Sequence, residues 1–438
     1  MVTEGFIQSQ SMPKPDRSKL KEYPSISLEE RDRRWGLIRN MMEENDVGAL
    51  MVVPGMQFDD PSNYLTNSGS PMLFFPLKGE PIAFLRANAL AIDTQMKSEA
   101  YGIKSWVKEA RYMSGGEGDE WVNILKDYGL TGSRIGTVAS GHFARLQQQR
   151  TANALINTIK SALPNVDFVD LWKQYVQIFQ VKSDEELNFF RKAALAGEVA
   201  AEEFVNACKP GNTVADVQNA VMSTLIPYGV DIRLPGIGCG PHGGRGLPWM
   251  QRGMNPPVIN NGDLLTSELF IWVGSLHAQV QMAVSIGEPN EEKKKLAALT
   301  REAYENGVET IRPGITWGEV SEAMNKPNRR EGAWKVCPLA HSLNPIECVD
   351  NHPEGMLGPN GFPGLRERFG DLNWELIESS EGRPRKFEMI IQEGSTFQFE
   401  PNSNQGQTYV TIGGNIIITK DGCEELNKIS TQMIVVPS

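Results

Sequence analysis

The sequence lacks the features that would place a protein in a membrane or in an oxidising compartment. Among its 438 residues, no apolar run approaches the length needed to span a bilayer. The segment from Met1 to Phe6 contains no basic stretch followed by an apolar run, so we expect no signal peptide. The cysteines are odd in number and lack the paired spacing of zinc or redox sites. We therefore expect a cytoplasmic protein with free thiols, at Cys208, Cys239, Cys337, Cys348 and Cys423.

Positive charge is in deficit as well, with 43 Lys and Arg residues against 54 Asp and Glu residues. An acidic surface repels nucleic acid and anionic membranes, so we expect neither as a partner. The apolar and charged fractions, 40% and 22%, are ordinary for a globular protein. The chain is long enough for two domains with a large core, and its charge does not argue against a small-molecule partner.

The first 180 residues divide by pattern into two parts. Residues 1–26 are polar and carry Pro13 and Pro15, which predicts an N-terminal arm. In residues 27–180, strand-like and helix-like runs alternate, which predicts an α/β domain with helices flanking a sheet. The capping-box pattern Ser27-Leu-Glu-Glu30 predicts the start of the first helix, which runs to about Asn45.

Residues 181–438 form a third part, in which long strands mixed with paired helices predict an α+β sheet domain. The capping-box pattern Ser183-Asp-Glu-Glu186 begins a helix whose apolar residues recur at steps of three, four or seven. The expected strands cover 231–238, 264–273, 278–286, 396–400 and 408–419, and the expected helices cover 291–311 and 317–325. An irregular insertion at about 356–386, rich in Gly, Pro and charge, is either a lid or a solvated loop.

Short motifs follow one another in the third part. They are Lys182-Ser-Asp-Glu-Glu-Leu187 with Arg191-Lys-Ala, then Gly262-Asp263-Leu-Leu, Ala340-His341-Ser342, Phe399-Glu400-Pro401 and Asp421-Gly-Cys-Glu424. Their order and spacing resemble the pita-bread superfamily of creatinase, prolidase, aminopeptidase P and methionine aminopeptidase. Asn63-Tyr64-Leu65-Thr66 resembles the substrate-domain motif of the creatinase and prolidase branches. The resemblance implies a two-domain protein, with a smaller N-terminal α/β domain and a C-terminal pita-bread domain.

The superfamily's peptidases hold two divalent metal ions with Asp, Asp, His, Glu and Glu. The resemblance assigns these positions, in chain order, to Glu268, Gln279, His341, Glu400 and Gly413. Gln279 and Gly413 stand where the superfamily has the carboxylates that bridge the two metals. A bridge between two dications needs a negative group with two free oxygens. The resemblance therefore implies that no two-metal site forms, and that Gln279→Asp with Gly413→Glu would begin to restore metal binding.

We expect no cofactor. One divalent metal ion is the alternative, because Glu268, His341 and Glu400 would offer one imidazole and two carboxylates to iron, manganese or zinc.

Creatinase resembles this chain in having lost the bridging carboxylates, and it works on a carbon–nitrogen bond with a His and carboxylates. We therefore predict His341, Glu400 and Glu268 as catalytic residues, with Glu400 as general base and His341 as proton donor. Gln279 and Gln281 lie two apart on one strand and share a face. Their amides would bind substrate and hold oxyanion charge. The plainer alternatives are a satisfied buried His–Glu pair and ordinary alternation of polar residues.

Four further residues are weaker candidates for binding substrate. His277 shares the face of Gln279 by alternation. Trp249 lies in a stretch that is similar to dimethylsulfoniopropionate lyase, and it either stacks on a cationic or planar group or packs in the core. His242 either replaces the creatinase histidine or is a turn residue. Glu347 stands where the superfamily often has a second His or an acid.

The sequence thus predicts a homodimeric, creatinase-like hydrolase or lyase. It would cleave a carbon–nitrogen or similar bond of a small polar or zwitterionic molecule without two metals. One alternative is a single-metal hydrolase or lyase that resembles dimethylsulfoniopropionate lyase. Another is a catalytically inactive binding protein, against which the retention of His341 and Glu400 argues. A true peptidase is the least expected, because it would need a metal-activated water.

Overall fold

A computed structural model describes residues 5–53, 61–67, 72–85, 100, 105–112, 117–139, 152–233, 236–244, 253–335, 337–348 and 389–438. The chain divides into two compact units. The N-terminal unit comprises Ser25–Glu185 with Asn344–Ile346, and the C-terminal unit comprises Met1–Pro24, Glu186–Leu343 and Glu347–Ser438.

The N-terminal unit is built on one sheet with the strand order β5-β4-β3-β2-β6-β7. β2, β6 and β7 run parallel, whereas β2, β3 and β4 are joined antiparallel. Apolar clusters cover both faces, one beneath α1 and α6 and the other beneath α4 and α5, as an α/β domain requires. Its elements are α1 (Leu28–Glu44), β2 (Ala49–Val53), α2 (Pro61–Thr66), β3 (Met72–Pro76), β4 (Ile82–Leu85), β5 (Glu109–Tyr112), α4 (Glu117–Asp127), β6 (Arg134–Ala139), α5 (Ala152–Ala162), β7 (Asp167–Asp170) and α6 (Trp172–Gln180).

Helix α1 begins as predicted, because the Ser27 hydroxyl accepts the backbone N–H of Glu30 at 3.0 Å. The other half of the predicted capping box is wrong. The Glu30 carboxylate does not return to Ser27 but accepts hydrogen bonds from Arg33 at 2.7 and 2.8 Å and from Arg34 at 2.7 Å. The Ser27 N–H donates instead to the Glu185 carboxylate at 2.7 Å. An ion pair with two arginines outcompetes a single backbone donor.

Arg34 is fully buried against the α2 helix, which contains the Asn63-Tyr64-Leu65-Thr66 motif. Its guanidinium donates to the carbonyl oxygen of Tyr64 at 3.0 Å. It also lies 4.7 Å from the centre of the Tyr64 ring and 5.2 Å from that of Trp106. The Asn63-Tyr64-Leu65-Thr66 motif therefore contacts the buried guanidinium of Arg34.

The C-terminal unit contains a sheet with the order β1-β19-β11-β10-β8, in which β9 also pairs with β10. A second sheet has the order β13-β12-β14-β17-β18, and β15 pairs with β16. The helices are α7 (Asp184–Ala207), α8 (Val214–Leu225), α9 (Glu291–Thr310) and α10 (Trp317–Glu331). The strands are β1 (Phe6–Gln8), β8 (Asp231–Arg233), β9 (Ile237–Gly240), β10 (Leu264–Val273), β11 (Leu276–Ile286), β12 (Ala340–Leu343), β13 (Glu347–Cys348), β14 (Thr396–Phe399), β15 (Asn402–Gln405), β16 (Thr408–Thr411), β17 (Gly414–Ile418), β18 (Cys423–Glu425) and β19 (Met433–Val436).

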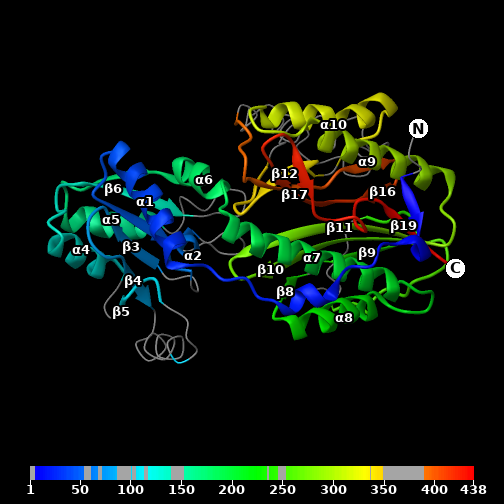
Figure 1. Cartoon of the computed structure of the whole chain (residues 1–438), viewed down its shortest axis with the longest axis horizontal. Coiled ribbons are helices and arrows are strands. Elements are labelled where there is room, and N and C mark those ends of the chain that lie inside the picture. The colour runs from blue at the N-terminus through cyan, green and yellow to red at the C-terminus, as the bar shows by residue number, and fades with distance from the viewer. Residues whose placement is uncertain are drawn as a thin grey trace. The chain divides into compact units, whose positions relative to one another are not determined.

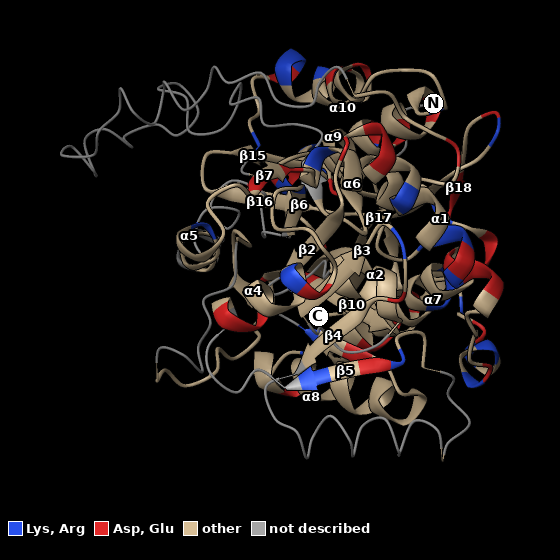
Figure 2. Cartoon of the chain, turned by 90° about the vertical axis from the view of Figure 1, so that its left-hand side faces the viewer, with Lys and Arg blue, Asp and Glu red and all other residues tan. Residues whose placement is uncertain are grey.

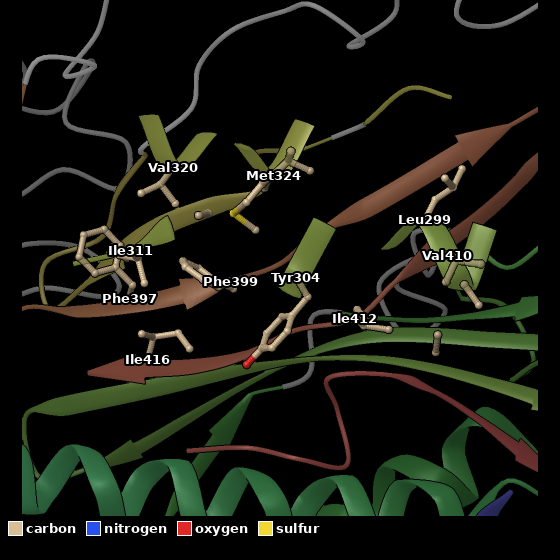
Figure 3. Close-up of a cluster of buried hydrophobic side chains, with 14 of the residues drawn as sticks. Leu299, Tyr304, Ile311, Val320, Met324, Phe397, Phe399, Val410, Ile412 and Ile416 are labelled. Carbon is tan, nitrogen blue, oxygen red and sulfur yellow. The ribbon is translucent and has the colours of Figure 1, made fainter. Parts of the chain in front are cut away.

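Helices cover both sides of these sheets, with α9 and α10 on one side and α7 and α8 on the other (Figure 1). The α9–α10 pair packs on the second sheet through a buried apolar cluster (Figure 3). In this cluster the rings of Tyr304 and Phe399 meet edge to face at 5.9 Å, and Met324 lies beside them. The paired helices thereby position β14 and Glu400, the residue that follows it.

Helix α10 is longer than predicted. The sequence pattern predicts a helix over residues 317–325, but the helix continues through Pro327 to Glu331. A proline inside a helix leaves the carbonyl four residues earlier without its donor. Here the side-chain amide of Asn306 donates to that carbonyl, of Ala323, at 3.3 Å.

Two predicted strands are each split. The run 231–238 becomes β8 and β9, and the run 408–419 becomes β16 and β17, which are separated at Ile412 and Gly413. The residues predicted to form an N-terminal arm contribute β1, which pairs in parallel with β19. The insertion at 356–386 lies outside the described residues.

The central strands β2 and β3 of the N-terminal sheet carry no charged residue. Figure 2 shows Lys, Arg, Asp and Glu on helices such as α1 and α7 and on β5, whereas β2 and β3 carry none. In the described ranges, no helix is long and apolar enough to cross a bilayer.

Candidate active site

One face of the β10–β11 hairpin carries most of the predicted site. The strands are rich in β-branched and aromatic residues and turn at Gly274, whose φ of +62° suits glycine. Directly paired residues of antiparallel strands point to the same face. The pairs on this face are Glu268 with Gln281, Phe270 with Gln279 and Trp272 with His277.

Glu400 and His341 come from the second sheet. β12 pairs with β14 so that His341 lies beside Gln398. Glu400 follows β14 directly and lies two residues beyond Gln398. Both His341 and Glu400 are almost fully buried, with 5% and 4% of their surface exposed.

The Glu400 carboxylate connects the two sheets. Its Oε2 accepts hydrogen bonds from Nε2 of Gln279 at 3.0 Å and from Nε2 of Gln281 at 2.6 Å. Its Oε1 lies 3.7 Å from Nε2 of His341. Three residues that sequence reasoning singled out, Gln279, Gln281 and His341, therefore meet around the buried Glu400 carboxylate, itself a predicted site residue.

The hydrogen bond on the other side of His341 fixes one of its protons. Nδ1 lies 2.8 Å from the carbonyl oxygen of Ser342, which only accepts, so Nδ1 carries a hydrogen. The lone pair of a neutral imidazole would then face the Glu400 carboxylate. A proton on Nε2 or on Glu400 would remove this repulsion, so the two groups are placed as an acid–base pair.

The amides around Glu400 leave oxygens unsatisfied. Because Gln279 and Gln281 turn their N–H groups to the carboxylate, their Oε1 atoms point elsewhere. These two oxygens and Oε1 of Gln398 are buried and have no hydrogen-bond partner among the described residues. A buried acceptor without a donor costs about 1–3 kcal/mol. A ligand with several N–H or O–H groups would remove that cost.

The two-metal cluster of the superfamily's peptidases does not fit these residues. Gln279 offers a neutral amide, and a Cβ at Gly413 would lie 2.3 Å from the carbonyl oxygen of Phe399 and 2.7 Å from Nε2 of Gln398. The expectation that Gln279→Asp with Gly413→Glu would begin to restore metal binding stays a prediction, and it requires the Phe399 carbonyl and the Gln398 side chain to shift. In the described parts of the chain, no three His, Cys, Asp or Glu side chains are arranged to hold a metal ion.

Aromatic residues extend the same face toward β8. The Trp272 ring stacks on the His277 imidazole at 5.4 Å, and the Phe270 ring lies 6.2 Å from Trp272. The guanidinium of Arg233 lies 4.6 Å from the centre of the Trp272 ring. His277 is thus on the predicted face. Sequence reasoning did not name Phe270 and Trp272, although the alternation that placed His277 on the face of Gln279 applies equally to Glu268 and these two residues of β10.

The other predicted residues have separate positions. Glu268 is half-buried beside Gln281 on the shared face. His242 is exposed, and its Nδ1 lies 3.1 Å from the Thr408 hydroxyl, outside the Glu400 cluster. The backbone of Glu347 lies in β13 beside Ser342, but its side chain is outside the described part of the structure, as is all of Trp249.

The Gly262-Asp263 turn before β10 is held by several polar contacts. The Asp263 carboxylate accepts the backbone N–H of Asn260 at 2.8 Å, and Lys293 donates to the carbonyl of Gly262 at 2.6 Å. Cys239 lies 3.7 Å from the same carboxylate. Burial, reinforced by Asp263, raises the pKa of Cys239 to about 12. The thiol therefore stays protonated at neutral pH and is unsuited to act as a nucleophile.

Comparison with known proteins identifies the family. The sequence pattern of metallopeptidase family M24 matches residues 188–420, which is more than half of the chain. The chain belongs to metallopeptidase family M24. This M24 chain has the pita-bread fold predicted from its motifs, preceded by an N-terminal α/β region, and M24 is a family of hydrolases.

The relatives of this M24 protein are distant. A probable dipeptidase PepE of Mycobacterium tuberculosis is 22% identical over 92% of this chain and 96% of its own length. The structure of dipeptidase PepE from Mycobacterium ulcerans matches 94% of this chain and 100% of its own, with a TM-score of 0.69 and 18% identity. The prolidase from Pyrococcus horikoshii OT3 matches 90% and 98%, with a TM-score of 0.66 and 16% identity. At this level of identity the structural likeness shows the fold alone.

Proposed function

We propose that this M24 protein is a metal-independent hydrolase that cleaves a carbon–nitrogen or similar bond of a small polar or zwitterionic molecule. The observation that carries the proposal is the Glu400 carboxylate, which accepts two amide N–H groups on one oxygen and faces His341 with the other. Where the family's peptidases have bridging acids, this chain has Gln279 and Gly413.

The pair supplies the two proton transfers that hydrolysis needs. Glu400 takes a proton from an attacking water, and His341 gives a proton to the leaving nitrogen through Nε2. The water oxygen forms a bond to carbon as the carbon–nitrogen bond breaks. The proton on Glu400 then returns to His341, because a small side-chain rotation would close the 3.7 Å separation of the two groups to hydrogen-bond distance.

The unsatisfied amide oxygens indicate what the substrate presents. Gln279, Gln281 and Gln398 each hold a buried Oε1 that lacks a donor among the described residues. A head group with several N–H bonds, such as an amidino or ureido group, would donate to them while Glu400 balances a positive charge. Phe270 and Trp272, half-buried on the same face, would pack on the planar part of such a group.

A screen of amidino, ureido and cyclic amidine compounds tests the proposal, with amine release measured with and without a chelator. Turnover should persist in the chelator. Glu400→Gln and His341→Ala should each lower kcat by about 100- to 10 000-fold while the fold is retained. Glu322→Gln, at an exposed ion pair with Arg329, is the matched control and should keep full activity.

Peptide hydrolysis is the second candidate, because the similar proteins are called dipeptidase and prolidase. It predicts that dipeptides are cleaved and that cleavage stops in the chelator. A single-metal hydrolase or lyase with Glu268, His341 and Glu400 as ligands also predicts loss in the chelator, but with small-molecule substrates. Full activity of both Glu400→Gln and His341→Ala would refute the site assignment under every reading. Tight binding of a compound without turnover would favour an inactive binding protein.

We also propose a cytoplasmic homodimer, as the superfamily resemblance implies. Light scattering on the purified protein should give about twice the chain mass of 48.6 kDa. A mass of one chain at micromolar concentration would contradict the dimer.

A further inference from the structure

The side chain of Asn415, in β17, hydrogen-bonds to the backbone of Gln279 in the way that a neighbouring strand would. The backbone N–H of Gln279 donates to Oδ1 of Asn415 at 3.0 Å, and Nδ2 of Asn415 donates to the carbonyl of Gln279 at 2.9 Å. The backbone N–H and carbonyl of Gln279 would otherwise form an unpaired edge of β11. A side-chain amide of fixed orientation takes the place of a ladder pair.

Asn415 is itself held by Asn427. Oδ1 of Asn427 accepts both the backbone N–H of Asn415 at 2.9 Å and its Nδ2 at 2.7 Å. Asn427 Nδ2 then donates to the carbonyl of Ala194 at 3.0 Å and to Glu198 at 3.2 Å. In each of these contacts a donor faces an acceptor. Rotating the side-chain amide of Asn415 or Asn427 by half a turn would place donor against donor and acceptor against acceptor.

The chain of contacts ends on a buried charge. Oε1 of Glu198, on α7, accepts the backbone N–H groups of Lys428 and Ile429 at 2.9 and 2.8 Å. Asn415, Asn427 and Glu198 are buried, with 0%, 1% and 7% of their surface exposed. A fully connected buried network of this kind permits one arrangement of its members.

We propose that Asn415, supported by Asn427 and Glu198, is a positioning residue for the reaction. It fixes the backbone of Gln279, and thereby the 3.0 Å hydrogen bond from Gln279 Nε2 to Glu400. The backbone of Gln281 is held differently, since its backbone N–H donates to the carbonyl of Gly413 at 3.4 Å. The catalytic role of Glu400 rests on the proposed function, but the hydrogen-bond relay to it does not.

Isosteric Asn→Asp substitutions test the relay. Asn415→Asp replaces the donor to Gln279 with an acceptor, and Asn427→Asp makes a similar change one link further out without contacting Gln279. Asn328 is the matched control, because it is equally buried, donates to the carbonyl of Asn402 at 3.0 Å and accepts from Ser403 at 2.6 Å. Asn328→Asp changes the same chemistry outside the relay.

The readout is the side-chain amide signal of Gln279 in glutamine-labelled protein, assigned with Gln279→Glu. Asn415→Asp should move this signal most and Asn427→Asp less, whereas Asn328→Asp should leave it in place. The Gln281 signal should move less than that of Gln279 in each relay variant. With a substrate in hand, Asn415→Asp should lower kcat by about 10- to 100-fold with little change in KM.

An unchanged Gln279 signal in both relay variants would overturn the proposal and leave the asparagines as packing residues. If Asn415→Asp does not fold, Asn427→Asp alone decides between the outcomes. The proposed function fails separately, when Glu400→Gln keeps full turnover, and that result would leave the amide signals unaffected.

Discussion

Two buried carboxylates, Glu30 in α1 and Glu400 after β14, are satisfied in opposite ways. Glu30 is bonded to Arg33 and Arg34, and Arg34 is further held by Tyr64. Glu400 has two neutral amides on one oxygen and a titratable imidazole near the other. The first carboxylate is paired with two guanidinium groups, whereas the second has only neutral amides and one imidazole beside it.

The difference shows how to distinguish a structural acid from a reactive one in this protein. The guanidinium of Arg34 beside Glu30 is buried, bonds to Glu30 and to the Tyr64 carbonyl, and lies near the Tyr64 and Trp106 rings. Around Glu400, the amides of Gln279 and Gln281 retain buried oxygens without a described donor. Buried acceptors of this kind are groups to which the donors of a bound substrate could bond.

The largest predicted effect on stability is at the structural acid. Glu30→Gln leaves Arg34 buried with its charge uncompensated and should lower the free energy of unfolding by about 3–5 kcal/mol. Glu400→Gln should change it by less than about 1 kcal/mol, because the new amide oxygen still accepts from Gln279 and its N–H donates to His341. Urea unfolding of both variants measures the difference, and equal losses would remove the distinction.

An intermediate effect is expected at Gly413, which separates β16 from β17. A methyl group there would meet the carbonyl oxygen of Phe399 at 2.3 Å. Gly413→Ala should therefore lower the free energy of unfolding by about 1–3 kcal/mol and loosen Glu400. Gly422→Ala, at an open position in the β17–β18 turn, is the control and should have little effect. Equal stability of the two variants would mean that β14 moves freely.

The smallest effects concern pH. Burial acts to raise the pKa of Glu30, but its arginine partners outweigh this and leave the pKa below the ordinary 4.5. Burial raises the pKa of Glu198 above 4.5, and three N–H donors offset it only in part. Glu30 therefore contributes stability above pH 4.5 that is lost as pH falls through its lowered pKa. Glu198 contributes stability below pH 4.5 that is lost as pH rises through its raised pKa.

Unfolding free energies from pH 3 to 8 test these signs. Glu30→Gln should flatten the acid limb of the wild-type curve, and Glu198→Gln should reduce the decline above pH 4.5. Identical curves for the two variants would contradict the assigned directions.

Sequence patterns located the residues that occupy inherited positions. His341 and Glu400 stand in recognisable motifs, and the spacing along one hairpin located Gln279 and Gln281, because strand alternation follows directly from sequence. The same patterns failed where a different partner competes for a group. The Glu30 carboxylate bonds to Arg33 and Arg34 instead of completing the predicted capping box. The Asn306 side chain donates to the carbonyl that Pro327 leaves without a donor, and α10 continues past its predicted end.

Residues that act across sheets could not be predicted from the sequence. Gln398 lies beside Gly413 because β14 pairs with β17, and Asn415 bonds to Gln279 because the start of β17 lies against β11. Neither residue occupies a ligand position of the family. In the sequence, Gly413 indicates only a missing metal ligand. In the structure, the absence of a side chain there allows Phe399 and Gln281 to approach closely.

Elemental analysis of the protein, produced with added manganese and zinc and purified without chelator, tests the central claim most directly. The claim is that Gln279 and Gly413 prevent the family's metal cluster and leave Glu400 and His341 to act by proton transfer. The account predicts metal below about a tenth of an equivalent, with undiminished turnover of an identified substrate. About one or two equivalents that resist dialysis, with activity lost on their removal, would contradict it.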